Sequence, residues 1–283
     1  MPELPEVETI ARTLQLRLPG LTIAESRIML SKVIHAPTDG DDFIDLIKGK
    51  QIMRICRRGK YLLVYLSEGY CLMFHFRMTG NLTYCQADQP FAKHTHLIMY
   101  LDNGCQLRYA DTRQFGGVWL LTLKDLEQTP GYRELGPEPF DPSFTAKQLR
   151  ELLNHKHRRI KTLLLDQTIV AGLGNIYADE ALHRAGINPE TTASALNRQA
   201  VSRLHKSIRA VLREGIDNRG ASIRDYIDGE GQSGNYQNLL RVYGKEGRPC
   251  TKCGAYIIRK KISGRSSFFC PACQQDTTAE LDK

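Results

Sequence analysis

Four cysteines near the end of the chain place the tightest limits on how it can fold. They form two Cys-x2-Cys pairs separated by sixteen residues, Cys250, Cys253, Cys270 and Cys273. Thiolates at this spacing can surround one tetrahedral zinc ion. Four protein ligands leave no open position for a catalytic water, so we expect one structural Zn²⁺ that holds a β-hairpin. The other four cysteines have uneven spacing and are interpreted as reduced thiols of a cytosolic protein: Cys56, Cys71, Cys85 and Cys105.

The charge of the chain indicates a polyanionic partner. Its formal net charge is +8 over 283 residues, which favours association with nucleic acid. An anionic membrane surface is the competing partner, but the sequence contains no basic amphipathic helix or apolar anchor. No segment approaches the roughly 20 apolar residues of a membrane span, and the amino terminus lacks the pattern of a signal peptide. We therefore expect a nucleic-acid partner and no membrane partner.

The first eight residues, MPELPEVE, suit covalent chemistry. Bacterial aminopeptidases remove an initiator Met that precedes a small residue, so the mature chain is expected to begin with the amine of Pro2. An α-amino group titrates near ~8, so a useful fraction is neutral and nucleophilic at neutral pH. A secondary amine that attacks a sugar C1′ gives an iminium ion, and Glu3 can serve as its acid/base partner. The alternative is a surviving proline beside acidic residues that favour a helix start, with the helix running from about Thr9 to Leu18.

The rest of the chain predicts an α+β fold with several domains. Residues 21–121 contain short strand-like runs separated by turns, which indicate an antiparallel β-sandwich or flattened barrel. A proline-rich linker at 136–142 follows. Helices are expected at 145–153, 160–165, 177–185 and 198–215, and the glycine-rich segment 220–235 is expected to be a mobile loop. The predicted domains are a β-sandwich domain at 1–132, a helical domain at 133–235 and a zinc finger at 236–283.

The opening run and the cysteine pairs closely resemble the formamidopyrimidine-DNA glycosylase family, and the resemblance extends over nearly the whole chain. It implies a bifunctional DNA glycosylase and abasic-site lyase of base excision repair, which removes 8-oxoguanine and formamidopyrimidines from damaged double-stranded DNA. It also implies a β-sandwich followed by a helix–two-turn–helix domain and a zinc-finger hairpin. We expect a monomer in the bacterial cytoplasm, associated with the nucleoid. A nucleotide cofactor is not expected, because the glycines near residue 172 lack the strand and spacing of a nucleotide-binding loop.

The resemblance implies catalytic roles for four residues. The amine of Pro2 would attack C1′ while Glu3 protonates the sugar ring oxygen, and β- and δ-elimination would follow from the Schiff base. Lys60, in a basic run that leads into a strand, would assist this chemistry. Arg265, in a basic turn between the cysteine pairs, would contact phosphate beside the lesion. From the residues alone, this turn is equally compatible with a solvated loop.

The resemblance also implies DNA contacts. A flipped nucleotide leaves a gap in the duplex, and residues at two tight turns would fill it: Met78, Arg113 and Phe115. Gln114 stands where many family members carry a second arginine. Further contacts are implied for His94, Lys156 and Asn175. Asn175 belongs to a glycine-containing turn that would present a helix amino terminus to phosphate.

Three alternatives remain open from the sequence. A related endonuclease VIII-like enzyme would prefer oxidised pyrimidines. A non-catalytic zinc-finger protein would explain the charge and the cysteines but would leave Pro2 without a role. A zinc-ribbon RNA or ribosome binder would explain the same features but not the opening octet. Blocking the amino terminus distinguishes the enzymes from the binding proteins.

Overall fold

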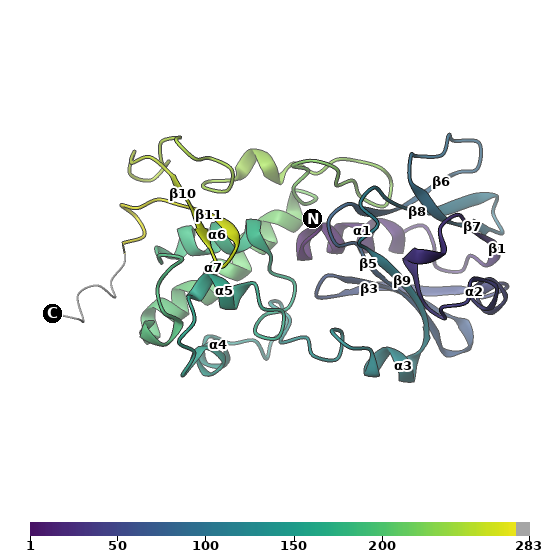
Figure 1. Ribbon diagram of the computed structural model, residues 1–283, viewed down its shortest axis with the longest axis horizontal. Helices are drawn as coiled ribbons and strands as arrows, with labels where there is room; N and C mark the ends of the chain where they lie inside the picture. The colour runs from purple at the N-terminus through teal and green to yellow at the C-terminus, as the bar shows by residue number, and fades with distance from the viewer. Residues whose placement is uncertain (276–283) are drawn as a thin grey trace. The chain divides into compact units, whose positions relative to one another are not determined.

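The computed structural model describes residues 1–275 and divides into two compact units (Figure 1). Unit 1 comprises residues 1–133 and 215–237, and unit 2 comprises residues 134–214 and the chain from 238 onward. Residues 215–237 thus fold with the amino-terminal unit although they follow the helical segment. The three domain boundaries drawn from the sequence stay a prediction. Among the described residues, no helix is both long and apolar enough to span a lipid bilayer.

Two β-sheets form unit 1. The five-stranded sheet has the order β2-β9-β5-β4-β3, and the four-stranded sheet has the order β1-β7-β8-β6. Their strands are β1 (Ile23–Ile28), β2 (Ile34–Ala36), β3 (Ile52–Arg58), β4 (Tyr61–Leu66), β5 (Tyr70–His75), β6 (Gly80–Gln86), β7 (Thr95–Leu101), β8 (Cys105–Asp111) and β9 (Gly117–Thr122). All but one of the pairs are antiparallel, as expected for the sandwich. The exception is the parallel pair β2–β9, which the sequence did not predict.

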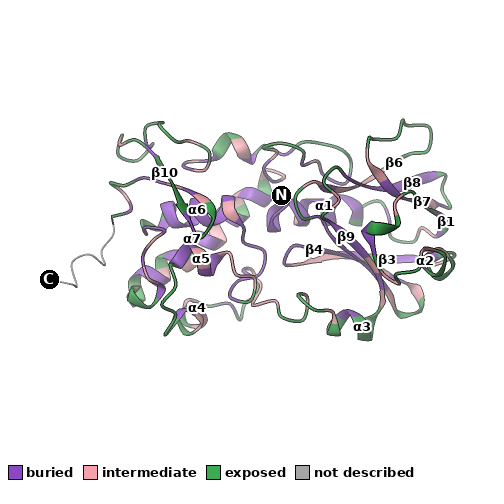
Figure 2. Cartoon of the chain, viewed as in Figure 1, coloured by how far each residue is buried: buried purple, intermediate pink, exposed green. Residues whose placement is uncertain are grey.

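The core of unit 1 lies between the sheets and one helix. Alternate residues of the strands point inward, and Figure 2 shows the strands of the two sheets largely buried. The helix α1 (Leu4–Gln15) adds Val7, Ile10 and Leu14 from one of its faces, and all three are fully buried. This spacing of three and four residues is that of an amphipathic helix. The core therefore fixes the orientation of α1 and of the chain end that precedes it.

The helix α1 begins earlier than the sequence predicted. It starts at Leu4, whereas the prediction started near Thr9. Glu3 is the N-cap, Pro5 suits the first turn, and the Glu6 carboxylate accepts a hydrogen bond from the Glu3 N–H. Proline and a reciprocal acidic cap favour this position, so the octet is itself helical. Two further helices of unit 1 were not predicted either: α2 (Gly40–Ile47) and α3 (Leu123–Gln128).

Unit 2 contains helices followed by a hairpin. The helices are α4 (Ala146–Leu153), α5 (Ile160–Leu164), α6 (Asn175–Ala185) and α7 (Arg198–Asp217), and the last residues of α7 belong to unit 1. The Thr145 hydroxyl caps α4 by accepting from the Gln148 N–H. The hairpin pairs β10 (Ile258–Ile262) with β11 (Arg265–Phe269). Across both units, single 3₁₀ turns occur at Ser31–Val33, Ser67–Gly69, Ala193–Ala195 and Tyr236–Leu239.

The glycine-rich segment 220–235 is attached to α1. The Ala221 N–H donates to the Glu6 carboxylate at 2.7 Å, and the Gly229 N–H donates to the Thr13 hydroxyl at 3.1 Å. The Tyr226 side chain is 8% exposed, and its hydroxyl donates to the Glu6 carbonyl at 3.3 Å. These contacts hold several positions of the segment against α1, and the expectation of a mobile loop stays a prediction. Within the segment, residues 223–225 and 230–233 are exposed.

Candidate active site and DNA-contacting residues

Pro2 and Glu3 lie at the amino end of α1, where the chain enters the core of unit 1. Pro2 is buried and Glu3 is 2% exposed, whereas Met1 is 46% exposed. The Glu3 N–H donates to Oε2 of Glu6 at 2.8 Å, and Oε1 of Glu6 accepts from the Ala221 N–H. One carboxylate thus holds both the backbone beside Pro2 and the glycine-rich segment. A nucleophile at this position has a fixed backbone, which favours a defined attack geometry.

Lys60 lies in the turn between β3 and β4, at the same end of unit 1 as the start of α1. The helix and β3 run in opposite directions: Gln15 accepts from the Ile55 N–H at 2.6 Å, and Glu8 accepts from Nε of Arg57 at 3.0 Å. Continuing this alignment by about one turn of helix and three residues of strand brings the first residues of α1 towards the β3–β4 turn. Lys60 is 8% exposed there. The structure therefore gathers the predicted nucleophile, its acidic neighbour and the predicted lysine at one end.

A buried histidine that the sequence reasoning missed lies beside Lys60. His75 ends β5, and its ring centroid is 4.7 Å from that of Tyr61, the residue opposite in β4. Burial, together with the nearby Arg77 and Lys60 cations, lowers the pKa of His75 to about 3. The imidazole is neutral at pH 7 as a result. Its Nδ1 accepts from the Arg77 N–H at 3.2 Å, which assigns the ring proton to Nε2. The position of His75 at the end of an apolar strand was the available sequence signal.

The structure brings Met78, Arg113 and Phe115 together, as the resemblance implied. Nη1 of Arg113 donates to Sδ of Met78 at 2.8 Å, and its guanidinium carbon lies 4.7 Å from the centroid of the Phe115 ring. The side chains of Met78 and Phe115 are 39% and 56% exposed. Large apolar groups beside an exposed cation can enter a base stack. These three residues are called the wedge below.

His94 is set in a loop that a buried arginine organises. His94 has a left-handed backbone, with φ of 66°, in the connection between β6 and β7. Arg108 of β8 is 5% exposed and directs its guanidinium into this connection. Its Nε donates to Gln106 at 2.7 Å, and its Nη atoms donate to the carbonyls of Gln86, Ala87, Gln89 and Pro90. All five N–H groups of the guanidinium are therefore used inside the protein. Arg108, which the sequence reasoning also missed, holds the loop.

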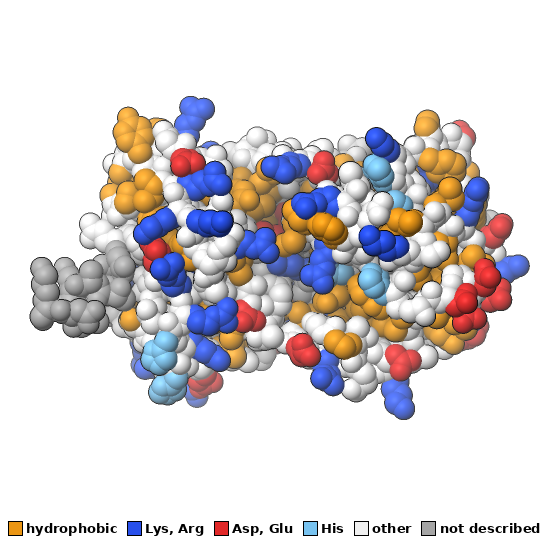
Figure 3. Space-filling view, viewed as in Figure 1, with side chains coloured by type: hydrophobic (Ala, Val, Ile, Leu, Met, Phe, Trp, Pro, Cys, Tyr) orange, Lys and Arg blue, Asp and Glu red, His pale blue; other side chains and the backbone are white. Residues whose placement is uncertain are grey.

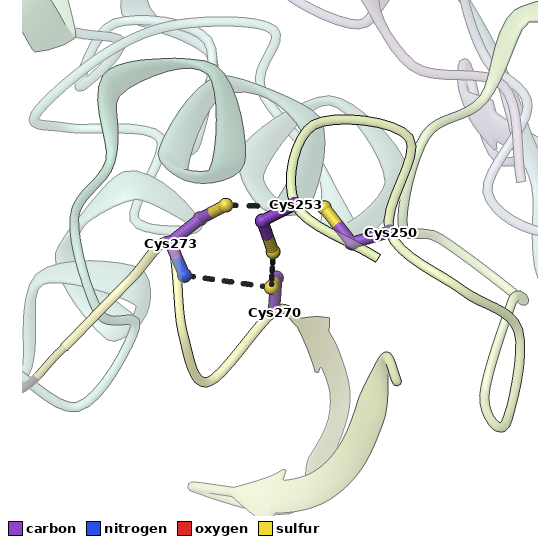
Figure 4. Close-up of side chains that lie close together, drawn as sticks. All are labelled: Cys250, Cys253, Cys270 and Cys273. Carbon is purple, nitrogen blue, oxygen red and sulfur yellow. Dashed lines mark hydrogen bonds between the residues drawn. The ribbon is translucent and has the colours of Figure 1, made fainter. Parts of the chain in front are cut away.

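The four cysteines of the carboxyl-terminal motif converge in unit 2 (Figure 4). Their sulfur atoms all lie within 4.8 Å of one another, with 3.5 Å between Cys253 and Cys270 and 3.9 Å between Cys250 and Cys273. A tetrahedral set of Zn–S bonds of ~2.3 Å places sulfur atoms about 3.8 Å apart. Burial raises the pKa of Cys250, but hydrogen bonds from the Lys252 and Cys253 N–H groups outweigh it and lower the pKa to about 7. Donor type and spacing fit one structural Zn²⁺.

The zinc-site hairpin is also fastened to the helices of unit 2. The Ser266 carbonyl accepts from Nδ2 of Asn175 at 2.9 Å and from Nζ of Lys161 at 3.0 Å. Lys161 is 1% exposed and pairs with Asp179 at 2.6 Å. The structure thereby places the predicted residues Asn175 and Arg265 on elements that touch, since Arg265 directly precedes Ser266. A lysine among apolar residues of α5 was the only sequence signal for this buried pair.

Basic side chains surround Arg265 and Lys156. Arg265 is exposed and lines a pocket of about 230 Å³ together with Arg158 and Lys161. Lys156 is exposed in the segment after α4, where its carbonyl accepts from the Ser194 N–H at 3.2 Å. Figure 3 shows Lys and Arg side chains gathered over the helices and hairpin of unit 2, while Asp and Glu gather over α2 of unit 1. Unit 2 therefore presents a cationic surface that suits phosphate.

Three family models match successive parts of the chain. The formamidopyrimidine-DNA glycosylase N-terminal domain matches residues 1–118, and the H2TH domain of the same glycosylase matches residues 135–226. A zinc finger found in FPG and IleRS matches residues 247–275. The zinc-finger match includes all four cysteines of the motif.

Curated relatives and solved structures match nearly the whole chain. The formamidopyrimidine-DNA glycosylase of Pelotomaculum thermopropionicum is 55% identical over 275 residues, 97% of this chain and 99% of that protein. The one from Bacillus cereus is 42% identical over 275 residues, with the same coverage. Lactococcus lactis Fpg in complex with DNA containing an abasic site has a TM-score of 0.90 and 40% identity, and covers 97% of this chain and 100% of that chain. MutM in complex with DNA containing carbocyclic 8-oxo-G gives the same values.

Proposed function

Because this chain belongs to the formamidopyrimidine-DNA glycosylase family, we propose that it excises oxidised purines from duplex DNA and cleaves the strand at the resulting site, with the amine of Pro2 as nucleophile. The observation that carries the proposal is the geometry at the start of α1. Pro2 and Glu3 are buried at the end of unit 1 where the β3–β4 turn presents Lys60. Removal of Met1 is required, because an amide nitrogen is not nucleophilic.

The proposed chemistry begins with attack of the Pro2 nitrogen on C1′ of the damaged nucleotide. The glycosidic bond breaks, the base leaves with a proton, and protonation of the sugar ring oxygen by Glu3 opens the ring to an iminium ion. Loss of a C2′ proton then expels the 3′ phosphate, and a second elimination expels the 5′ phosphate. Water hydrolyses the remaining Schiff base and restores the amine.

Two cations, Lys60 of unit 1 and Arg265 of unit 2, would act on the phosphates. Lys60 is buried beside a neutral His75, so the imidazole adds no further positive charge at that position. Arg265 stands exposed at the start of β11, where it can meet the phosphate flanking the lesion. Positive charge fixed near a leaving phosphate stabilises the charge that develops on it. The burial of Lys60 and the exposure of Arg265 support the roles proposed for them.

The remaining DNA contacts divide by function. The wedge would occupy the gap left by the everted nucleotide, with Arg113 facing the orphaned base. His94, Lys156 and Asn175 would bind the backbone, and Asn175 begins α6, where helix N–H groups favour phosphate. The glycine-rich segment 220–235 would close over the everted base. The relatives are bacterial proteins, and we propose that this chain acts as a monomer on nucleoid DNA in the cytoplasm.

A substrate comparison tests the proposal. Duplexes carrying 8-oxoguanine opposite cytosine or thymine glycol opposite adenine are incubated with the chain after removal of Met1. We expect faster excision of 8-oxoguanine, and a one-nucleotide gap bounded by phosphates at both ends, as β,δ-elimination requires. Faster excision of thymine glycol would favour the endonuclease VIII-like alternative. Binding of either duplex without cleavage would favour a non-catalytic zinc-finger protein.

A further inference from the structure

The carboxylate of Asp111, at the end of β8, is fully buried. Its Oδ1 accepts from the Thr79 hydroxyl at 2.5 Å and from the Arg113 N–H at 3.2 Å. Its Oδ2 accepts from the Gly116 N–H at 2.8 Å and, more weakly, from the Tyr109 hydroxyl at 3.5 Å. None of these partners is a cation. A buried carboxylate is costly unless its oxygens are well bonded, so this arrangement needs the turns that supply the donors.

These hydrogen bonds join the two turns that carry the wedge. Thr79 belongs to the turn between β5 and β6 and follows Met78, while Arg113 and Gly116 belong to the turn between β8 and β9. The Thr79 hydroxyl also accepts from the Arg113 N–H at 3.0 Å, so it donates to one partner and accepts from the other. The two turns therefore share one hydrogen-bond centre directly beneath the wedge.

The backbone at this centre is tightly determined. Arg77 and Gln114 both have left-handed backbones, with φ of 50° and 56°. Such conformations are unfavourable for residues other than glycine and persist where surrounding contacts enforce them. A Cβ on Gly116 would lie 2.1 Å from the Tyr109 hydroxyl oxygen, so no side chain fits there. The wedge thus stands on turns held by Asp111 and not on flexible loops.

The backbone of Asp111 reaches the third DNA-facing loop of unit 1. Its N–H donates to the His94 carbonyl at 3.1 Å, and its carbonyl lies 2.8 Å from Nε2 of His96. The wedge residues and His94 are consequently all tied to one buried residue. None of these contacts involves the amino end of α1, where the chemistry is placed.

We propose that Asp111 is a positioning residue that holds the wedge in the conformation needed to evert a nucleotide, and that the Thr79 hydroxyl carries this effect to the turn bearing Met78. The proposal rests on the glycosylase function proposed above and extends it. Insertion of the wedge requires three side chains to enter the duplex together, and ordering them in advance removes the cost of ordering them during insertion. Chemistry on a substrate without a stacked lesion does not need the wedge.

The variants T79V and T79S test this assignment. T79V keeps the shape of the side chain but removes the hydroxyl, while T79S restores the hydroxyl. The single-turnover rate is measured on a duplex with 8-oxoguanine opposite cytosine and on a single-stranded oligonucleotide with an abasic site. A 2-aminopurine beside the lesion reports unstacking. T38V, in an exposed position of the same unit, is the matched control.

We expect T79V to slow duplex excision about tenfold or more, the effect of losing a hydrogen bond to a charged group. The fluorescence rise should slow in parallel, while cleavage of the single strand stays within about twofold of wild type. T79S should recover most of the duplex rate, and T38V should match wild type. D111N should show the same selective loss on the duplex. If D111N does not fold, the comparison of T79V with T79S tests the proposal by itself.

Equal duplex rates for T79V and wild type would overturn the assignment. Equal losses on the duplex and the single strand would also overturn it, because they indicate a merely structural role. A wild-type chain that cleaves neither substrate would contradict the proposed function, and this inference with it. Selective loss on the duplex together with rescue by T79S supports the positioning role.

Discussion

Blocking the amine of Pro2 should reduce strand cleavage by about 10³-fold or more while leaving DNA affinity nearly unchanged. An acyl group on this nitrogen converts the amine into an amide, which has no lone pair available for attack on C1′. The residues proposed to bind the duplex lie elsewhere in the sequence, so binding does not need the amine. Loss of cleavage with intact binding separates the chemical role of Pro2 from a structural one.

The measurement compares one protein before and after proteolytic removal of an amino-terminal extension that ends directly at Pro2. Cleavage of an abasic-site duplex and the dissociation constant for a stable abasic analogue are determined for both forms. The processed form, whose first residue is verified by mass spectrometry, is the matched control. Strand cleavage at an undiminished rate by the extended form would contradict the role of Pro2.

Replacement of Cys270 by Ser should remove the bound zinc and reduce cleavage by about 100-fold or more. Cys270 is fully buried, and structural zinc contributes on the order of 10–16 kcal/mol of apparent binding free energy in finger peptides. Without the metal, the two cysteine pairs that flank β10 and β11 are no longer joined to each other. Arg265 then loses its fixed position, and misplacement of a positioning group by about 1 Å can cost 10²-fold in rate.

The chain offers a control for this replacement. Cys85 lies in β6, outside the metal cluster, and Cys85→Ser should retain one zinc per chain and near wild-type cleavage. Metal content is measured by elemental analysis, and hydrogen exchange reports the protection of residues 258–269. Normal cleavage by the Cys270→Ser protein without bound metal would show that Arg265 does not depend on the zinc. Unit 1 has its own core and should stay folded in both variants.

The sequence predicted the elements whose signals are local. The Cys-x2-Cys pairs indicated the zinc hairpin, and the helix expected at 145–153 matches α4. Each signal depends on a few neighbouring residues and on backbone preferences that context rarely overrides. α2 was missed although Asp39 caps it, because residues 21–121 as a whole have the alternation of strands.

Contacts between distant residues could not be predicted in this way. The Glu6–Ala221 and Thr13–Gly229 hydrogen bonds each join residues more than 200 positions apart, and no local sequence pattern predicts them. The parallel pair β2–β9 is likewise a property of the whole sheet. The buried charged residues Arg108 and Lys161 were not singled out from the sequence. Their importance arises from burial, which depends on the complete fold.

The most direct test of the account is borohydride trapping with a duplex that contains 8-oxoguanine opposite cytosine, using protein from which Met1 has been removed. Borohydride reduces the Schiff base to a stable amine and so links the protein covalently to the DNA. We expect an adduct that peptide mapping locates at Pro2. An adduct located at Lys60, or no adduct despite tight binding to the same duplex, would contradict it.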